Sequence, residues 1–367
     1  MTRALTTRPL GPSPSLDGQR KPRPEVLLTD PSPCLRVRVL RELLGRPEND
    51  PEVRELEALR REDPLLARII MRQQSNGSFD GKIYATSLAL SRLGFLGFGP
   101  SFPPAARAAE WLFSKQRRDG SWPLSDTGDE EGQRYSMIPL QTALPLTGLA
   151  RAGYAEDPRA ERGYHWLLER RLPDGAWPSG LASGVHGYVA GYRRLPHSRW
   201  GCRTNTTESL ICLSLHPRLR YGEEARRALG HLLARETRER SALGFEAARS
   251  AGFEEARGYF TYHAAWDPGL VLELCARIGA PPDDERVAGL LEFIGSCRGG
   301  YGLWEYTADP RAGAWVSFTL QRALEMREEG SAEAARAGLG SAEAARDILP
   351  AEPRTPFAAY PKRKRRY

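Results

Sequence analysis

Two carboxyl groups in the sequence stand beside aromatic residues, an arrangement that suits acid chemistry. Asp267 follows Trp266, and Glu305 lies between Trp304 and Tyr306. Burial among apolar groups raises the pKa of a carboxylic acid and keeps it protonated near neutral pH, and aromatic faces stabilise a developing positive charge. Asp267 and Glu305 are therefore the candidate catalytic residues, as acids that would protonate a bound molecule. Asp267 also has a structural interpretation, because an aspartate directly before a proline is typical of a helix N-cap.

A wider set of aromatic and polar residues is expected at the entrances of helices that surround a cavity. Aromatic faces bind cations and apolar chains alike, so these side chains are candidate ligand-binding residues. The alternative is that many are packing residues, because Trp and Tyr commonly bury the ring and leave a polar tip in water. The candidates are Tyr84, Tyr135, His186, Trp200, Tyr262, His263, Trp266, Trp304 and Trp315.

Metal ligands and phosphate-binding loops are poorly represented. His197 and Cys202 form the only compact His/Cys group in the sequence, and no third or fourth ligand stands near them, so a loop histidine and a buried thiol are the simpler interpretation. The acidic run 283–285 is typical of an N-cap and the first turn of a helix. No Gly-rich phosphate loop is present. We therefore expect neither a metal nor a cofactor.

The elements that position these residues follow from a recurring segment. Five times, an apolar helical run is followed by a polar Gln or Arg turn and then by a glycine close to an aromatic residue. Asn-Gly and Asp-Gly favour turns with positive φ, and we expect the aromatic ring to fold back on the helix that it follows. The five glycines are Gly77, Gly120, Gly175, Gly244 and Gly300.

Apolar periodicity places helices between these turns, and they alternate between two types. Segments with more small residues and prolines are expected to form an inner ring: 34–44, 84–94, 137–152, 204–215, 264–278 and 315–327. Longer and more charged segments are expected outside it: 52–74, 104–117, 157–171, 222–238, 283–297 and 331–348. Six pairs close a ring, which has no end face that needs a polar cap. The prediction is an all-α, α/α toroid with 34–44 beside 315–327, and six pairs disfavour an open solenoid with partners on its concave face.

One of the turns carries a family resemblance. Lys115-Gln-x-x-Asp-Gly-Ser-Trp122 resembles the Gln-Trp repeat of squalene-hopene and oxidosqualene cyclases, and the glycine–aromatic turn is similar to one in protein prenyltransferase β subunits. Similar turns occur at 75–79 and 173–177, and the resemblance covers roughly residues 33 to 330. It implies a toroid whose central cavity takes an apolar, isoprenoid-type ligand.

The catalytic motifs of those families are missing. The sequence has no Asp-x-Asp-Asp, the acid motif of type II cyclases, and no Asp-Asp-x-x-Asp, the magnesium motif of type I cyclases. Protein prenyltransferases bind zinc through an aspartate and a cysteine two positions later, but Gly269 occupies that position after Asp267. The function stays open between a cyclase-like or prenyltransferase-like enzyme and a non-catalytic toroid that binds a ligand or a protein.

Composition limits the remaining classes. Five cysteines without a C-x-x-C pair indicate a reducing compartment, and we expect a cytoplasmic protein. No apolar run approaches the roughly 20 residues of a membrane-spanning helix. The formal charge of +7 comes from the two ends of the sequence, so no nucleic-acid partner is expected, although the basic tail could contact an anionic membrane surface. The predicted organisation is a disordered leader (1–32), one toroid domain (33–348) and a basic tail (349–367).

Overall fold

The structure is a computed structural model that describes residues 23–123, 138–179, 181–182, 185–186, 189, 193–234, 242–255, 263, 266–281 and 283–336. These residues form helices, apart from one antiparallel pair of two-residue strands, β1 (Leu181–Ala182) and β2 (Val185–His186). None of the helices in these ranges combines the length and the apolar character needed to cross a membrane. The all-α prediction is confirmed.

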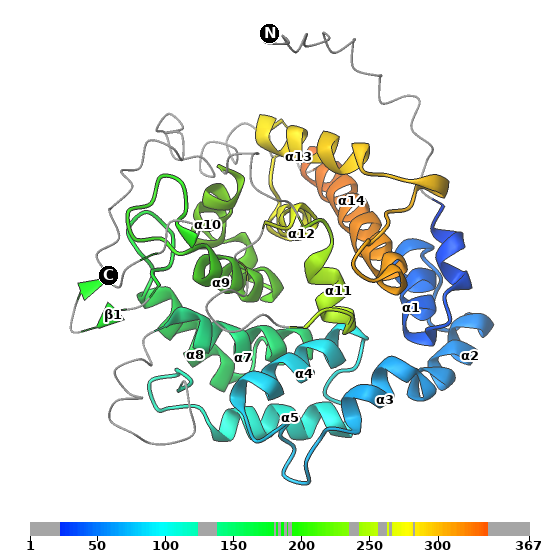
Figure 1. Cartoon of the computed structure of the whole chain (residues 1–367), viewed down its shortest axis with the longest axis horizontal. Helices are drawn as coiled ribbons and strands as arrows, with labels where there is room; N and C mark the ends of the chain where they lie inside the picture. Colours follow the sequence, from blue (N-terminus) through cyan, green and yellow to red (C-terminus); the bar gives the residue numbers. More distant parts are fainter. Residues whose placement is uncertain are drawn as a thin grey trace, which may run out of the picture.

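An inner ring of helices surrounds the centre of the molecule (Figure 1). It consists of α1 (Pro33–Arg38) with the π-helical turn η3 (Val39–Leu43), α4 (Ile83–Phe95), α7 (Pro139–Arg151), α9 (Arg203–Leu215), α12 (Pro268–Ile278) and α14 (Gly313–Arg336). From α4 to α14 each helix contacts the next, and α14 contacts η3, which closes the ring. At this closure the guanidinium of Arg38 lies 4.6 Å from the ring centroid of Phe318. The predicted neighbourhood of 34–44 and 315–327 is confirmed.

A second layer of helices packs outside the first. It contains α2 (Pro51–Leu59), η4 (Arg60–Glu62), α3 (Pro64–Ile70), α5 (Pro103–Ser114), α8 (Pro158–Glu169), α10 (Glu223–Leu233) and α13 (Glu285–Ser296). The predicted helix 52–74 is broken at Asp63, whose carboxylate caps α3 by accepting from the backbone N–H of Leu65 at 2.8 Å. The break has a local cause, because Pro64 has no N–H with which to continue the preceding helix.

Both ends of the described chain differ from the prediction. The sixth outer helix was expected to begin at residue 331, but α14 runs without a break to Arg336. Ala, Glu and Arg are strong helix formers, and they outweigh the cost of about 1 kcal/mol for Gly330 inside the helix. At the other end, η2 (Pro24–Thr29) packs against α1 and α14 and buries Leu27, so part of the predicted leader belongs to the fold. Residues 1–22 and 337–367 lie outside the described residues.

The glycine turns tie the two layers together. Positive φ is found at Gly77, Gly120, Gly175 and Gly244 as predicted, but the fifth glycine of this kind is Gly302 rather than Gly300. In three turns the indole N–H of a buried tryptophan donates to a carbonyl ten residues earlier, at 2.8 Å: Trp122 to Leu112, Trp177 to Leu167 and Trp304 to Ile294. The aromatic side chain therefore folds back on the outer helix that precedes it.

The same turns also hold the inner helix that follows. The backbone N–H of the aromatic residue donates to a hydroxyl on that helix: Phe79 to Thr86, Trp122 to Thr142, Trp177 to Thr206 and Trp304 to Ser317. At Gly120 a Cβ would lie 2.3 Å from the carbonyl oxygen of Arg162 on α8, so a third helix approaches this turn closely. Because the turns precede the inner helices, they gather the N-terminal ends of those helices at one end of the ring.

One helix of the structure was not predicted. α11 (Phe245–Ala251) lies on the inner side of the ring, where it contacts α4, α12 and α14 (Figure 1). Residues 246–251 are all buried, which means that α11 is covered on every side. It starts directly after Gly244, where a Cβ would lie 2.4 Å from Cγ1 of Val316. The fourth glycine turn thus leads into the lumen of the toroid instead of into an inner helix.

Candidate functional site

Asp267, the first candidate acid, is buried and joins two helices. Its Oδ1 accepts from the backbone N–H groups of Gly244 and Gly269 at 2.9 Å, and its Oδ2 accepts from that of Glu246 at 2.7 Å. These donors belong to the start of α11 and the first turn of α12, so one carboxylate caps both helices. Burial raises the pKa of Asp267 to about 6, although the backbone N–H groups favour the ionised form. The structural interpretation of this aspartate, as an N-cap, is confirmed.

Glu305, the second candidate acid, is exposed. It therefore lacks the burial among apolar groups that was expected for this candidate acid. Its neighbour Trp304 is only 2% exposed, and Trp315 is 1% exposed, both within the main hydrophobic core. For these two tryptophans the packing interpretation holds, and neither is among the residues that line the cavity described below.

The other sequence candidates are dispersed. His263 is buried with its Nε2 atom 2.7 Å from Oε2 of Glu208 on α9. Tyr84 packs against the apolar cluster at the start of α7, and burial raises its pKa. Trp200 and Trp266 are half-buried against the core.

The remaining candidate residues are two tyrosines, His186 and the His/Cys group. His186 belongs to β2, whereas Tyr135 and Tyr262 lie outside the described residues. Of the proposed His/Cys group, Cys202 is buried at the N-cap of α9, and His197 has a positive φ of 60°.

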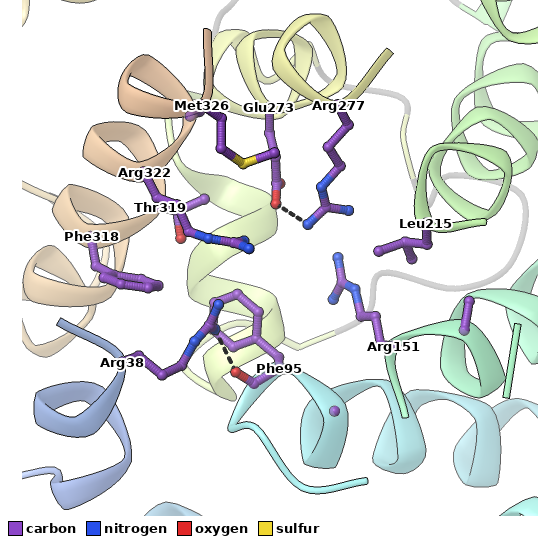
Figure 2. Close-up of a pocket in the computed structure, with 13 residues that line it drawn as sticks. Arg38, Phe95, Arg151, Leu215, Glu273, Arg277, Phe318, Thr319, Arg322 and Met326 are labelled. Carbon is purple, nitrogen blue, oxygen red and sulfur yellow. Dashed lines mark hydrogen bonds and ion pairs between the residues drawn. The ribbon is translucent and has the colours of Figure 1, made fainter. Parts of the chain in front are cut away.

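The structure has a cavity of about 160 Å³ at the other end of the ring, where α4, α7, α9 and α12 end and the middle of α14 passes (Figure 2). Every inner helix contributes to it, through Arg38 of α1, Phe95 of α4, Arg151 of α7, Leu215 of α9, Arg277 of α12 and Arg322 of α14. The cavity was expected to be apolar and aromatic, but four arginines line it. A wholly apolar ligand would exclude water from these charged groups, which is costly.

The four guanidinium groups point toward one another across the cavity (Figure 2). Arg38 holds Glu42 with two bonds, Nε to Oε1 at 2.6 Å and Nη2 to Oε2 at 3.0 Å. Arg322 forms an ion pair with the same carboxylate. On α12, Nη2 of Arg277 donates to Oε1 of Glu273 at 2.5 Å. Three of the arginines, Arg38, Arg277 and Arg322, are thus held in place by two carboxylates, of which Glu273 lines the cavity.

The pKa values report crowding of positive charge. Burial, together with the charges of the other three cavity arginines, lowers the pKa of Arg277 to about 10, although Glu273 raises it. Burial likewise lowers the pKa of Arg322, with Arg38 adding to the effect. Burial alone would raise the pKa of Glu42, but Arg38 and Arg322 lower it below its usual range. The environment therefore favours negative charge at this end of the ring.

Arg151 connects the cavity to α11. Its Nη1 donates to the hydroxyl of Ser250 on α11 at 2.6 Å and to that of Ser91 on α4 at 3.1 Å. Its Nη2 lies 3.3 Å from Oε1 of Glu246, also on α11. Burial alone would raise the pKa of Glu246, but Arg249 and Arg151 lower it to about 2. The helix in the lumen consequently orients one of the cavity arginines.

Sequence reasoning missed this site because charged helix residues were assigned to solvated surfaces. One signal was present: the last turns of four inner helices carry Arg38, Arg92, Arg151 and Arg277. A basic residue at a helix C-terminus also interacts favourably with the helix dipole, so the pattern by itself does not predict a binding site. The convergence of the guanidinium groups is a property of the closed ring.

Comparison with known proteins gives the family context. The sequence model of the squalene-hopene cyclase C-terminal domain matches residues 26–190. A probable squalene–hopene cyclase of Sinorhizobium fredii is 34% identical over 116 residues, which cover 29% of this chain and 18% of that protein. Lanosterol synthase of Homo sapiens is 29% identical over 125 residues, 31% of this chain and 17% of the synthase. The chain matches less than a fifth of the length of either relative.

Solved structures are similar at a lower level. A type II terpene cyclase from Scytonema, in complex with geranylgeranyl dihydroxybenzoate as its substrate, has 12% sequence identity and a TM-score of 0.30. The similarity covers 73% of this chain and 95% of the cyclase. A protein from Actinoplanes has 13% identity and a TM-score of 0.28, with coverages of 72% and 98%. Such TM-scores are too low to transfer the position of a ligand or of a side chain.

Proposed function

The chain belongs to the squalene-cyclase and terpenoid-cyclase superfamily, and from this premise we propose that it is a ligand-binding toroid whose site is the arginine-lined cavity. The observation that carries the proposal is the convergence of all six inner helices on one cavity. A site built from side chains of many helices is positioned by the whole ring, which favours a specific ligand over a surface contact.

The alternative of acid-initiated cyclisation has less support. Such a reaction requires a protonated carboxylic acid that faces the substrate. Both oxygens of Asp267 accept backbone N–H groups, and Glu305 is exposed. In addition, α11 occupies the lumen beside α4, α12 and α14. The sequence left open an enzyme and a non-catalytic toroid, and these observations favour the non-catalytic toroid.

One observation keeps an enzyme as the second candidate. Burial raises the pKa of Asp267 to about 6, so in a fraction of the molecules this carboxyl group is protonated near neutral pH. If the lumen admitted a polyene, Asp267 would be the proton donor, and the relatives named as squalene–hopene cyclases make squalene the first substrate to try.

Two measurements test the proposal. Native mass spectrometry of the protein purified from its own host should detect a bound small molecule, which a variant with an altered cavity arginine should lose. Incubation with squalene or with linear prenyl diphosphates should give no cyclised product. Cyclised product from the wild type would overturn the ligand-binding proposal in favour of an enzyme.

The carboxyl variants then assign the acid. Asp267→Asn and Glu305→Gln remove one acid each while keeping the size of the side chain. Product that disappears in Asp267→Asn alone would identify Asp267 as the donor, and product that persists in both variants would show an enzyme that uses a different acid. Absence of both product and bound molecule would remove both functions.

A further inference from the structure

We infer that the arginine-lined cavity binds a phosphate group with two negative charges, as the free ion or as the end of an alkyl phosphate. The inference rests on the proposed function, because it names the ligand chemistry of the same cavity. It uses the charges, the bonding and the shape of the cavity wall.

The charge balance comes first. Four guanidinium groups meet in the cavity, from Arg38, Arg151, Arg277 and Arg322. Two carboxylates, those of Glu42 and Glu273, form ion pairs with these arginines only, among the residues that the structure describes. Glu246 is shared between Arg151 and Arg249 of α11, so the four cavity arginines outnumber the carboxylates that pair with them alone. Crowding of partly buried positive charges is unfavourable. A dianion in the cavity would balance this excess.

A structural role for the arginines explains only part of their bonding. Arginines at helix C-termini often bind the last carbonyl groups. Arg38 does so, since its Nη1 donates to the carbonyl of Phe95 at 2.6 Å. The bonds that the structure shows for Arg151, Arg277 and Arg322 go to side chains instead. For these three arginines, capping of the inner helices does not account for their place in the cavity.

The geometry favours phosphate over other anions. Guanidinium groups offer planar forks that bind phosphate oxygens in pairs and stay charged throughout the physiological pH range. Here they approach from α1, α7, α12 and α14, which surrounds an anion instead of touching one side of it (Figure 2). The negative ends of the inner helix dipoles oppose an anion at this end. The arginines must therefore supply the attraction, which explains why several are needed.

The remaining wall is apolar and has room for a short chain. Phe95, Leu215, Phe318 and Met326 also line the cavity. Its volume of about 160 Å³ exceeds that of several water molecules at ~30 Å³ each. A phosphate among the arginines would thus leave apolar surface that an alkyl group could cover, whereas free phosphate would leave that surface to water.

Calorimetric titration of the full chain at low ionic strength tests the inference, with inorganic phosphate and butyl phosphate as probes. Arg322→Gln should weaken phosphate binding about tenfold or more, the effect expected for one charge-assisted contact. This variant should fold, because Glu42 keeps its two bonds to Arg38. The matched control is Arg311→Gln: this side chain is 72% exposed, precedes α14 and pairs with Asp309, so the affinity should not change.

A second variant should change the affinity for phosphate in the opposite direction. Glu273→Gln removes the carboxylate that holds Arg277, so the positive excess increases and phosphate should bind several-fold more tightly. Unchanged affinity in both Arg322→Gln and Glu273→Gln, or no binding of either probe to the wild type, would overturn the inference. Binding of butyl phosphate at least tenfold tighter than that of phosphate would assign an ester, and equal affinities would assign the free ion.

The same data separate the inference from the proposed function. A co-purifying molecule without an anionic group, displaced by cavity variants, would keep the ligand-binding function and exclude phosphate. A protein that binds neither a co-purifying molecule nor the two probes would fail both.

Discussion

At the scale of single residues, two carboxylates hold α11 inside the ring, and their environments act in opposite directions. Asp267 is surrounded by backbone N–H groups, and burial raises its pKa to about 6. Glu246 lies between Arg249 and Arg151, which lower its pKa to about 2 in spite of burial. A raised pKa makes the folded state less stable as the pH rises, and a lowered pKa makes it less stable as the pH falls. The attachment of α11 therefore responds to pH at both of these carboxylates.

The first prediction uses the raised pKa of Asp267. Its ordinary value is 3.8, so the folded state binds the extra proton between about pH 4 and 6. Over that interval the wild type should lose up to about 3 kcal/mol of unfolding free energy relative to Asp267→Asn. At pH 7 the asparagine variant should be less stable by about 1 to 2 kcal/mol, because its amide cannot accept both sets of backbone N–H groups. Urea unfolding at a series of pH values measures both effects.

Asp284→Asn is the control for this experiment. Asp284 caps only α13, and Arg286 lowers its pKa although burial alone would raise it. Its contribution is present above about pH 4 and is lost as the pH falls, the reverse of the pattern for Asp267. Parallel pH profiles for the two asparagine variants would show that burial does not control the titration of Asp267.

At the scale of elements, the sequence was informative where a local rule determines the structure. Gly77, Gly120 and Gly175 have the positive φ that Asn-Gly and Asp-Gly predict, and the inner helices begin close to the expected residues. The rule failed for α11, a seven-residue helix that is too short for a clear apolar period and whose polar residues Glu246, Arg249 and Ser250 are buried. It failed again at residue 331, where the composition favours helix on both sides of Gly330.

The candidate site was less predictable than the helices. Asp267 was correctly recognised as an N-cap from its position before a proline. The arginines of the cavity come from helices that are far apart in the sequence, and only ring closure brings their charges together. Local sequence patterns contain no information about such convergence, because an arginine that faces the cavity and an arginine on an exposed helix face have similar neighbours in the sequence.

The second prediction concerns the contact of α4 with α7, which depends on glycine. A Cβ at Gly148 would lie 2.6 Å from the carbonyl oxygen of Ser87, whereas a Cβ at Gly289 of α13 would have nothing within 4 Å. Gly148→Ala should therefore destabilise the protein by about 1 to 3 kcal/mol or more through overpacking. Gly289→Ala should stabilise it by about 0.5 to 1 kcal/mol, since alanine loses less backbone entropy in a helix. Equal effects of the two alanines in denaturant unfolding would mean that α4 and α7 are not in close contact.

At the scale of the whole molecule, a closed ring differs from an open array in the coupling between its two ends. Arg38 of α1 contacts Phe318 of α14 and, through Glu42, also Arg322. These contacts form both the closure of the ring and one wall of the cavity. Opening the ring would consequently disrupt the cavity, which is the proposed ligand site, without any change in the other helix pairs.

The third prediction tests this closure with a double-mutant cycle of Arg38→Met and Phe318→Leu. A cation–π contact at 4.6 Å should give a coupling energy of about 0.5 to 2 kcal/mol in denaturant unfolding. The control pairs Arg38→Met with Phe113→Leu on the outer helix α5, where additive effects are expected within about 0.5 kcal/mol. Additivity in the first cycle would place α1 and α14 apart and remove the toroid.

Closure of the ring also sets an order of events during protein synthesis. The partners of α1 at the closure lie on α14, and at roughly 5 to 20 residues per second the ribosome makes them some 15 to 60 s later. During that interval the surface of η3 and α1 that buries Val39 and Leu35 has no partner from α14. The helix pairs between α1 and α14 can pack onto one another as they are synthesised, but α1 and η3 can complete their contacts only after α14 has been made. We therefore expect a nascent chain that binds chaperones through its N-terminal helices and releases them when α14 emerges.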